Sequence, residues 1–77
     1  MKIQILGTGC PKCKQLAANA EQAIADLGLD AEIEKITGIN DIIEFGVMIT
    51  PALAIDGEVK ASGKALPVDQ IKQFLQQ

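Results

Sequence analysis

The sequence predicts an α/β domain with the element order βαβαββα and a mixed four-stranded sheet that carries helices on both faces. Three observations favour this class. Near the start, a short apolar strand pattern is followed by a long amphipathic helix pattern and a second strand pattern. An Asp-Gly pair then separates two further strand patterns, and another amphipathic segment lies near the C-terminus. At 77 residues, the chain is expected to form a single domain over residues 1–77.

The first strand is predicted over residues 3–6, where apolar side chains alternate with a polar one before Gly7 favours a turn. A long helix is predicted from Pro11, because proline lacks the N–H that would be unpaired at the first helical position. Gly28 is a typical C-terminal stop for this helix. The apolar stripe of the helix is formed by Leu16, Ala20, Ile24 and Leu27.

A second strand is predicted over residues 31–36, in which apolar residues first alternate with glutamates before Lys35 breaks the pattern. A strand, a helix of this length and another strand form by default a right-handed crossover with the two strands parallel. A short helix is predicted over residues 41–45, with Asn40 as its N-cap and Gly46 as its end.

The second half of the chain predicts a hairpin and a final helix. A buried strand is expected over residues 52–55, and the return strand over residues 58–61. Between them, Asp56 and Gly57 form a strong signal for a two-residue hairpin turn. Pro67 then opens a helix with one apolar face, made of Val68, Ile71, Phe74 and Leu75.

Composition argues against two classes of function. Seven basic and ten acidic residues give a net charge of −3, and Phe45 and Phe74 are the only aromatic residues, so no nucleic-acid surface is expected. No apolar stretch approaches the roughly 20 residues of a transmembrane helix, and the N-terminal one is shorter than the roughly 7 to 15 residues of a signal-peptide core. We therefore expect a cytoplasmic protein with no membrane partner. No oligomer interface is indicated, so a monomer is expected.

The chemistry of the chain is predicted to start at Cys10 and Cys13, the only cysteines in a sequence without histidine. They flank Pro11 and Lys12 where the first strand gives way to the helix, so the two thiols can close into a disulfide. The helix N-terminus favours the thiolate form. Cys10 should be the more exposed, so we assign it as the nucleophile and Cys13 as the resolving thiol. This chemistry needs no cofactor.

Three alternatives remain open for this pair. The two cysteines could be a structural bridge, although a bridge over so short a loop constrains little of the unfolded chain. A zinc site would need four ligands, and the chain offers two thiols. A Cu(I) carrier is the main alternative, because paired thiolates suit a soft ion. Small heavy-metal-associated domains carry this motif at the same junction, but with the order βαββαβ and usually a methionine where this chain has Thr8.

Three motifs together resemble the thioredoxin superfamily: the Cys-Pro-Lys-Cys sequence after the first strand, Thr50-Pro51 before the third, and the Asp-Gly hairpin. Over residues 2–76 the chain is similar to the small thioredoxin-like, redox-active disulfide proteins of archaea and bacteria. The resemblance implies a thioredoxin-like fold and a thiol-disulfide oxidoreductase acting on protein disulfides. It also implies an electron donor similar to thioredoxin reductase.

The resemblance further implies that Pro51 follows a cis peptide bond and lies against the disulfide, whereas the residues alone would predict a trans proline at a strand start. It implies that the backbone of Thr50 meets an extended substrate segment. We expect Pro11 and Lys12 to belong to the same substrate-binding surface. Two interpretations remain open for Ile42, Ile43, Met48 and Ile49: they are core residues, as such residues more often are, or they form an apolar collar around the disulfide that docks a protein partner.

The chain departs from thioredoxin itself at three places. Thioredoxin has Gly-Pro between its cysteines, a tryptophan before them and a buried aspartate that assists proton transfer. Here the order is Pro-Lys, as in glutaredoxins with proline first, Gly9 precedes the motif, and no buried acid is evident. The glycine pair and acid with which glutaredoxins hold glutathione are replaced by residues 62–64, Ser-Gly-Lys, so a glutathione site is not expected.

Overall fold

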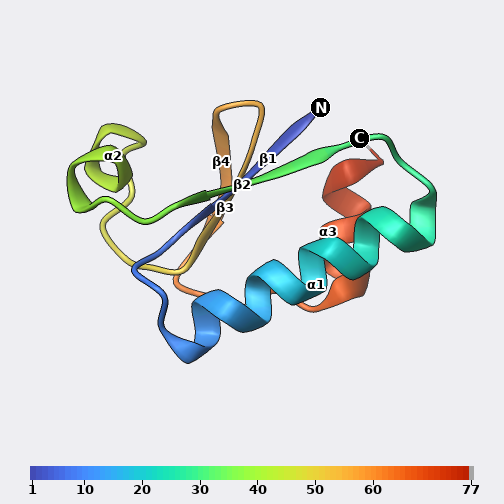
Figure 1. The fold of residues 1–77 in the computed structure, drawn as a ribbon, viewed down its shortest axis with the longest axis horizontal. Helices are drawn as coiled ribbons and strands as arrows, with labels where there is room; N and C mark the ends of the chain where they lie inside the picture. The colour runs from blue at the N-terminus through green and yellow to red at the C-terminus, as the bar shows by residue number, and fades with distance from the viewer. Residues whose placement is uncertain (77) are drawn as a thin grey trace.

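The computed structural model describes residues 1–76, which form one four-stranded sheet with helices on both faces (Figure 1). The strands are β1 (Lys2–Leu6), β2 (Glu32–Ile36), β3 (Ala52–Ile55) and β4 (Glu58–Ser62). The helices are α1 (Pro11–Leu27), α2 (Ile39–Glu44) and α3 (Val68–Leu75). This order confirms the predicted βαβαββα arrangement.

The sheet has the strand order β2-β1-β3-β4. β1 and β2 are parallel and are joined through α1, which confirms the predicted parallel pairing. β3 runs antiparallel to β1, with Leu6 opposite Ala52, and also antiparallel to β4. Because Leu6 and Ala52 are paired, the segment that follows β1 and the segment that precedes β3 lie side by side at the same end of the sheet.

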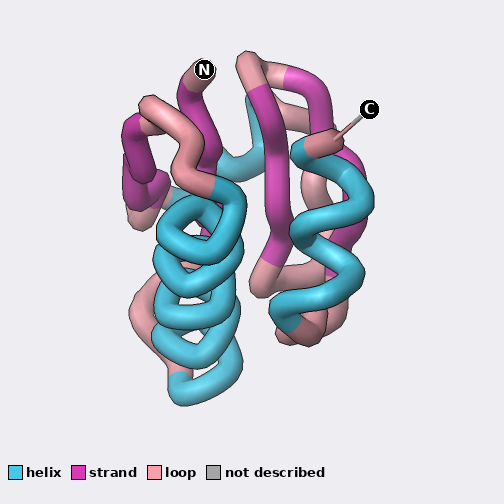
Figure 2. The backbone as a smooth tube through the Cα atoms, turned by 90° about the vertical axis from the view of Figure 1, so that its right-hand side faces the viewer, coloured by secondary structure: helices cyan, strands magenta, loops and turns pink. Residues whose placement is uncertain are grey.

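Helices α1 and α3 pack side by side on one face of the sheet (Figure 2). Ile3 and Ile5 point to this face because alternate residues of a strand share a side. The main core therefore joins three segments that are far apart in the sequence. Its other buried residues are Leu16, Ala17, Ala20, Ala23, Leu53, Ile55, Leu66, Ile71 and Leu75.

Helix α2 lies away from α1 and α3 and closes a smaller core on the opposite face (Figure 1). Leu6, Ala52 and Ala54 contribute from the sheet, and Ile42 and Val47 contribute from α2 and the segment after it. Phe45 is half-buried against this core, whereas Phe74 is half-buried against the main one. The core of residues 1–76 is therefore mostly aliphatic.

Several element boundaries differ from the prediction by one or two residues, and the largest difference is at the start of α2. Asn40 is not the N-cap of the short helix, because α2 begins at Ile39 and Gly38 is the capping residue. The Gly38 carbonyl accepts the N–H of Ile42 at 3.0 Å, so the helix begins two residues earlier than expected. Ala31 lies outside β2, since the ladder with β1 begins at the pair Lys2 and Glu32.

The predicted hairpin turn is present between β3 and β4. Asp56 and Gly57 have φ angles of 50° and 87°, the left-handed pair that a two-residue turn of this kind requires. The turn is attached to β1, since the Asp56 carboxylate accepts the Lys2 N–H at 2.8 Å and the Gln4 side-chain oxygen accepts the Gly57 N–H at 3.1 Å. Among residues 1–76, no helix has the length and apolar character needed to cross a membrane.

Candidate active site

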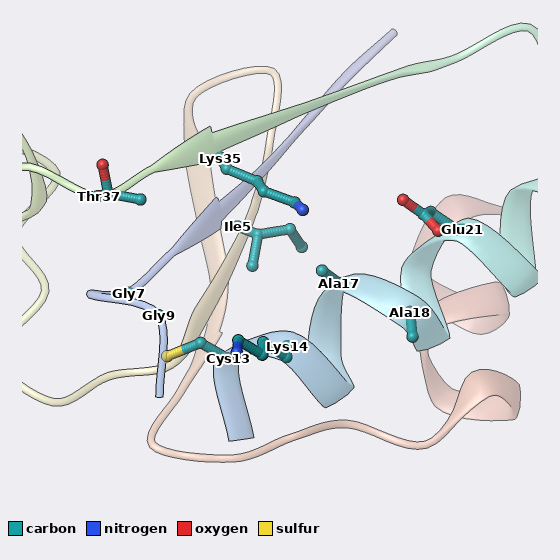
Figure 3. A pocket seen from close by; sticks show the side chains of 10 residues that line it. All are labelled: Ile5, Gly7, Gly9, Cys13, Lys14, Ala17, Ala18, Glu21, Lys35 and Thr37. Atoms are coloured by element: carbon teal, nitrogen blue, oxygen red, sulfur yellow. The ribbon is translucent and has the colours of Figure 1, made fainter. Parts of the chain in front are cut away.

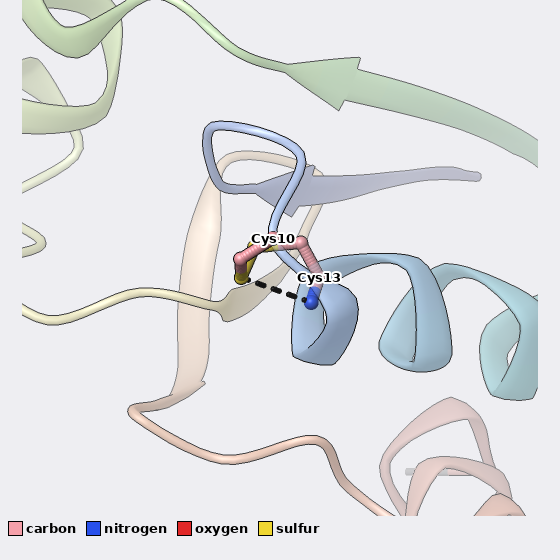
Figure 4. Close-up of a disulfide and its surroundings, with 2 residues drawn as sticks. All are labelled: Cys10 and Cys13. Atoms are coloured by element: carbon pink, nitrogen blue, oxygen red, sulfur yellow. Dashed lines mark hydrogen bonds between the residues drawn. A yellow bond between two sulfur atoms is a disulfide. The ribbon is translucent and has the colours of Figure 1, made fainter.

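Cys10 and Cys13 form a disulfide at the start of α1 (Figure 4). Their Cα atoms are 5.0 Å apart, within the usual span of a disulfide. Cys10 is the N-cap of the helix, and its sulfur accepts the backbone N–H of Cys13 at 3.2 Å. The sulfur therefore stands where the helix directs its free N–H groups, an environment that favours a negative charge.

The two cysteines differ in exposure. Cys10 is half-buried, whereas only 5% of Cys13 is exposed. Pro11 and Lys12 lie in the first turn between them, and both are exposed. This turn contains no acidic residue. A protein that approaches the disulfide therefore meets Cys10, the Pro-Lys pair and the positive end of the helix.

The sheet brings a second segment to the site. The peptide bond between Thr50 and Pro51 is cis, and Pro51 is fully buried whereas Thr50 is half-buried. Pro51 lies against the end of β1: an ideal Cβ built on Gly7 would stand 3.9 Å from the Pro51 Cα. The same Cβ would overlap the sulfur of Cys13. Gly7 therefore lies between Cys13 and Pro51, close to both.

An apolar groove of about 410 Å³ adjoins this segment. Thr8 from the loop before Cys10 and Thr50 line one part of it, and α2 with the residues after it lines the rest. Four large apolar side chains in this region are exposed, and we call them the apolar collar. They are Ile39 (64% exposed), Ile43 (57%), Met48 (89%) and Ile49 (64%).

The collar differs from the predicted one in two residues. Ile42 is only 5% exposed and belongs to the smaller core, so of the two interpretations the core one holds for it, although it also lines the groove. Ile39 was not predicted, yet it precedes Ile43 by four positions and so shares the outer side of α2. That spacing was visible in the sequence, but only once the start of the helix is placed at Ile39.

A second cavity, of about 270 Å³, lies on the flank of Cys13 between β2 and α1 (Figure 3). Lys35 reaches it from β2, and Lys14 and Glu21 reach it from α1. Lys35 is the residue at which the alternation of β2 breaks, because the position faces this cavity instead of the core. Glu21 is the only acidic residue in the lining. No buried acid lies among the lining residues beside Cys13.

Within residues 1–76, no group of three or more histidine, cysteine, aspartate or glutamate side chains is arranged to hold a metal ion. The two sulfurs are joined to each other. The geometry is therefore that of a dithiol/disulfide pair at a helix N-terminus, beside a second segment that carries a cis proline.

Comparisons with known proteins agree with this geometry. A family model described as a thioredoxin domain matches residues 1–76. A thioredoxin of Methanothermobacter thermautotrophicus is 48% identical over 75 residues, which cover 97% of each chain. A thioredoxin of Methanocaldococcus jannaschii is 47% identical over 73 residues, or 95% of this chain and 84% of that protein. These matches do not favour a copper carrier, and the chain belongs to the thioredoxin family of protein-disulfide oxidoreductases.

Proposed function

We propose that Cys10 is the nucleophile and Cys13 the resolving thiol of this oxidoreductase. The single observation that carries the assignment is the difference in exposure: Cys10 is half-buried at the surface of the site, whereas Cys13 is 5% exposed. In thiol-disulfide exchange the attacking, central and leaving sulfurs lie in one line, so the partner's sulfur needs open access to the cysteine with which it reacts. The more accessible cysteine is therefore the one that reacts with the protein partner. Cys13 is bonded to Cys10 and is placed to attack its sulfur.

The exchange balances in two steps. The Cys10 thiolate attacks one sulfur of a client disulfide, a mixed disulfide forms, and the other client sulfur leaves as a thiolate that takes up a proton. The Cys13 thiol then loses its proton and attacks the Cys10 sulfur, which forms the intramolecular disulfide and releases the second client thiol. Two electrons pass from the dithiol to the client. A reductase similar to thioredoxin reductase returns them by the reverse exchange.

The helix N-terminus supports the thiolate of Cys10. The Cys13 N–H donates to the Cys10 sulfur at 3.2 Å, and the partial positive charge of the helix end adds to this bond. Both stabilise the Cys10 thiolate, which is the form that attacks a client disulfide. Lys12, exposed beside Cys10, adds a further positive charge at the surface that a client meets.

We also propose that a client segment lies across Thr50, Pro11 and Lys12 and places an apolar side chain in the groove beside the collar. Among the residues that line the groove, Thr8 and Thr50 are the nearest in the chain to Cys10 and Pro51. Exposed apolar side chains gathered beside a reactive group favour a protein partner over a small polar one. We further propose that the protein works as a monomer in the cytoplasm, where thiols are kept reduced.

The test of the two cysteine roles is trapping of the covalent intermediate. Cys13→Ser should accumulate a mixed disulfide between Cys10 and an added protein disulfide, because no thiol remains to resolve it. Cys10→Ser should accumulate little, since its one remaining thiol is buried. Non-reducing gels and intact mass measure both products.

The control is the double variant Cys10→Ser with Cys13→Ser, which must give no adduct. Equal trapping by the two single variants would contradict the assignment of roles. An adduct on Cys13 alone would reverse it.

A further inference from the structure

We propose that Gly7 is a positioning residue for Cys13, and that its lack of a side chain favours the disulfide over the dithiol. The inference rests on the proposed redox role of the cysteine pair. It concerns how readily the pair becomes oxidised, and therefore how strongly the reduced protein donates electrons to a client.

Space, not backbone conformation, requires glycine at this position. The φ angle of Gly7 is outside the left-handed region, so other residues could adopt its backbone conformation. A Cβ at Gly7, however, would overlap the Cys13 sulfur and stand 3.1 Å from the Cys13 Cβ. Real Cβ atoms essentially never approach a sulfur so closely, so one of the two groups must move.

The backbone at Gly7 has little freedom to move. Its N–H donates to the Ile36 carbonyl at 2.9 Å, which extends the ladder between β1 and β2 by one bond. On the other flank, the pair of Leu6 with Ala52 ties the strand end to β3, and Pro51 follows closely. Cys13 must therefore yield if a side chain is added at Gly7.

The ability of Cys13 to yield differs between the two redox forms. In the disulfide, its sulfur is bonded to Cys10 and points toward the segment of Gly7 and Gly9 (Figure 3). It cannot rotate without breaking that bond. In the dithiol, the side chain is free to turn to another staggered position. A Cβ at Gly7 therefore costs more in the oxidised form, and it shifts the equilibrium toward the dithiol.

Gly9 supplies a matched control from the same loop. Its φ angle is 95°, so alanine there is strained by the backbone itself, but no atom beyond its two chain neighbours lies within 4 Å of its ideal Cβ. Gly9→Ala should therefore destabilise both redox forms alike. Only a side chain at Gly7 meets the Cys13 sulfur.

The experiment equilibrates wild-type protein, Gly7→Ala and Gly9→Ala with glutathione redox buffers and measures the disulfide fraction by thiol alkylation and mass. The equilibrium constant for disulfide formation should fall roughly 5- to 100-fold in Gly7→Ala, the range expected from overpacking a buried site. It should stay within about twofold of wild type in Gly9→Ala, since strain common to both forms cancels. A Gly7→Ala constant equal to that of wild type overturns the inference, and so does an equal shift in Gly9→Ala.

If Gly7→Ala folds too poorly for the redox titration, the inference is tested by measuring unfolding in two backgrounds. Gly7→Ala should lower the free energy of unfolding less when it is added to Cys13→Ala, which lacks the sulfur, than when it is added to the oxidised wild type. Equal losses in the two backgrounds would overturn the inference. A wild-type protein without a reversible disulfide transition would overturn the proposed function and the inference together, whereas a reversible wild type with an unshifted Gly7→Ala overturns the inference alone.

Discussion

Cys10 combines two tasks in one sulfur atom. In the proposed mechanism it is the reactive group that a partner meets, and it is also the N-cap acceptor for the first turn of α1. A good N-cap acceptor is a small polar side chain that receives an N–H two or three residues later. The redox site is therefore built into the element that begins the main helix, and changes at Cys10 act on activity and on helix stability together.

At the residue scale, serine and alanine should therefore differ at position 10. Cys10→Ser retains an N-cap acceptor, whereas Cys10→Ala leaves the Cys13 N–H without one. Both variants lack the disulfide, so the disulfide does not enter the comparison. We expect Cys10→Ser to be more stable by about 1 kcal/mol in urea unfolding. Equal stabilities would show that the sulfur contributes nothing as a cap.

At the element scale, the two ends of α1 are held by different interactions. The first turn is joined to the sheet end through Cys13 and Gly7, and the last turn is joined to α3 by an ion pair. In that pair, the Lys72 ammonium lies 2.9 Å from the Asp26 carboxylate. The helix stops at Gly28, whose φ of 65° allows its N–H to bond back to the last turn.

The ion pair makes a prediction about pH. The Lys72 ammonium, and after it the Gln22 amide, lower the pKa of Asp26 below its usual value. A carboxyl whose pKa is lower in the folded protein adds stability above its ordinary pKa and loses it as pH falls through the lowered value. Asp26→Asn should therefore unfold at a lower temperature than wild type at neutral pH, and the difference should close in acid, as pH falls below the ordinary pKa of an aspartate and through the lowered one.

The pair is at the surface, so the effect should be small and should weaken with added salt. Asp30→Asn, in the loop after α1, is the matched control for loss of one negative charge. Thermal unfolding of the three proteins across pH measures the effect. A difference between Asp26→Asn and wild type that persists unchanged into acid would contradict the ion-pair explanation.

At the scale of the whole molecule, the site is assembled by strand pairing. β1 and β3 are distant in the sequence, but their pairing brings Gly7, Cys13 and Pro51 together. The packing of α2 on the opposite face from α1 then leaves the apolar collar exposed beside the same edge. A protein client can therefore contact the collar and the disulfide at once.

If the apolar collar docks protein substrates, substitutions in it should lower kcat/KM more for a protein disulfide than for a small one. Ile43→Ser and Met48→Ser change exposed side chains, so the fold should be retained, but kcat/KM for a protein disulfide should fall roughly fivefold or more through a higher KM. The loss should be several times smaller with a small aromatic disulfide, which cannot span the collar. Ala25→Ser, exposed on α1, is the control and should match wild type. Equal losses on both substrates would contradict a docking role.

Much of the fold was predictable because its signals are local. Pro11 and Gly28 mark the ends of α1, and the Asp-Gly pair marks the hairpin. These residues act through the backbone angles and hydrogen bonds of their nearest neighbours in the chain, so a single sequence contains the information. The start of α2 was predicted wrongly because Asn40 is a typical cap, whereas the backbone of Gly38 serves instead.

The order of the elements, the position of the cysteine pair at a helix start and the chemistry available there could all be predicted from the sequence. Only the tertiary structure decided that Gly7 lies against the Cys13 sulfur, that Ile42 is buried while Ile39 is exposed, and that Lys35 faces a cavity. The physical reason is that close contacts between distant segments depend on strand register and helix placement. The pattern of residue types along a single sequence reports on neither the register nor the placement.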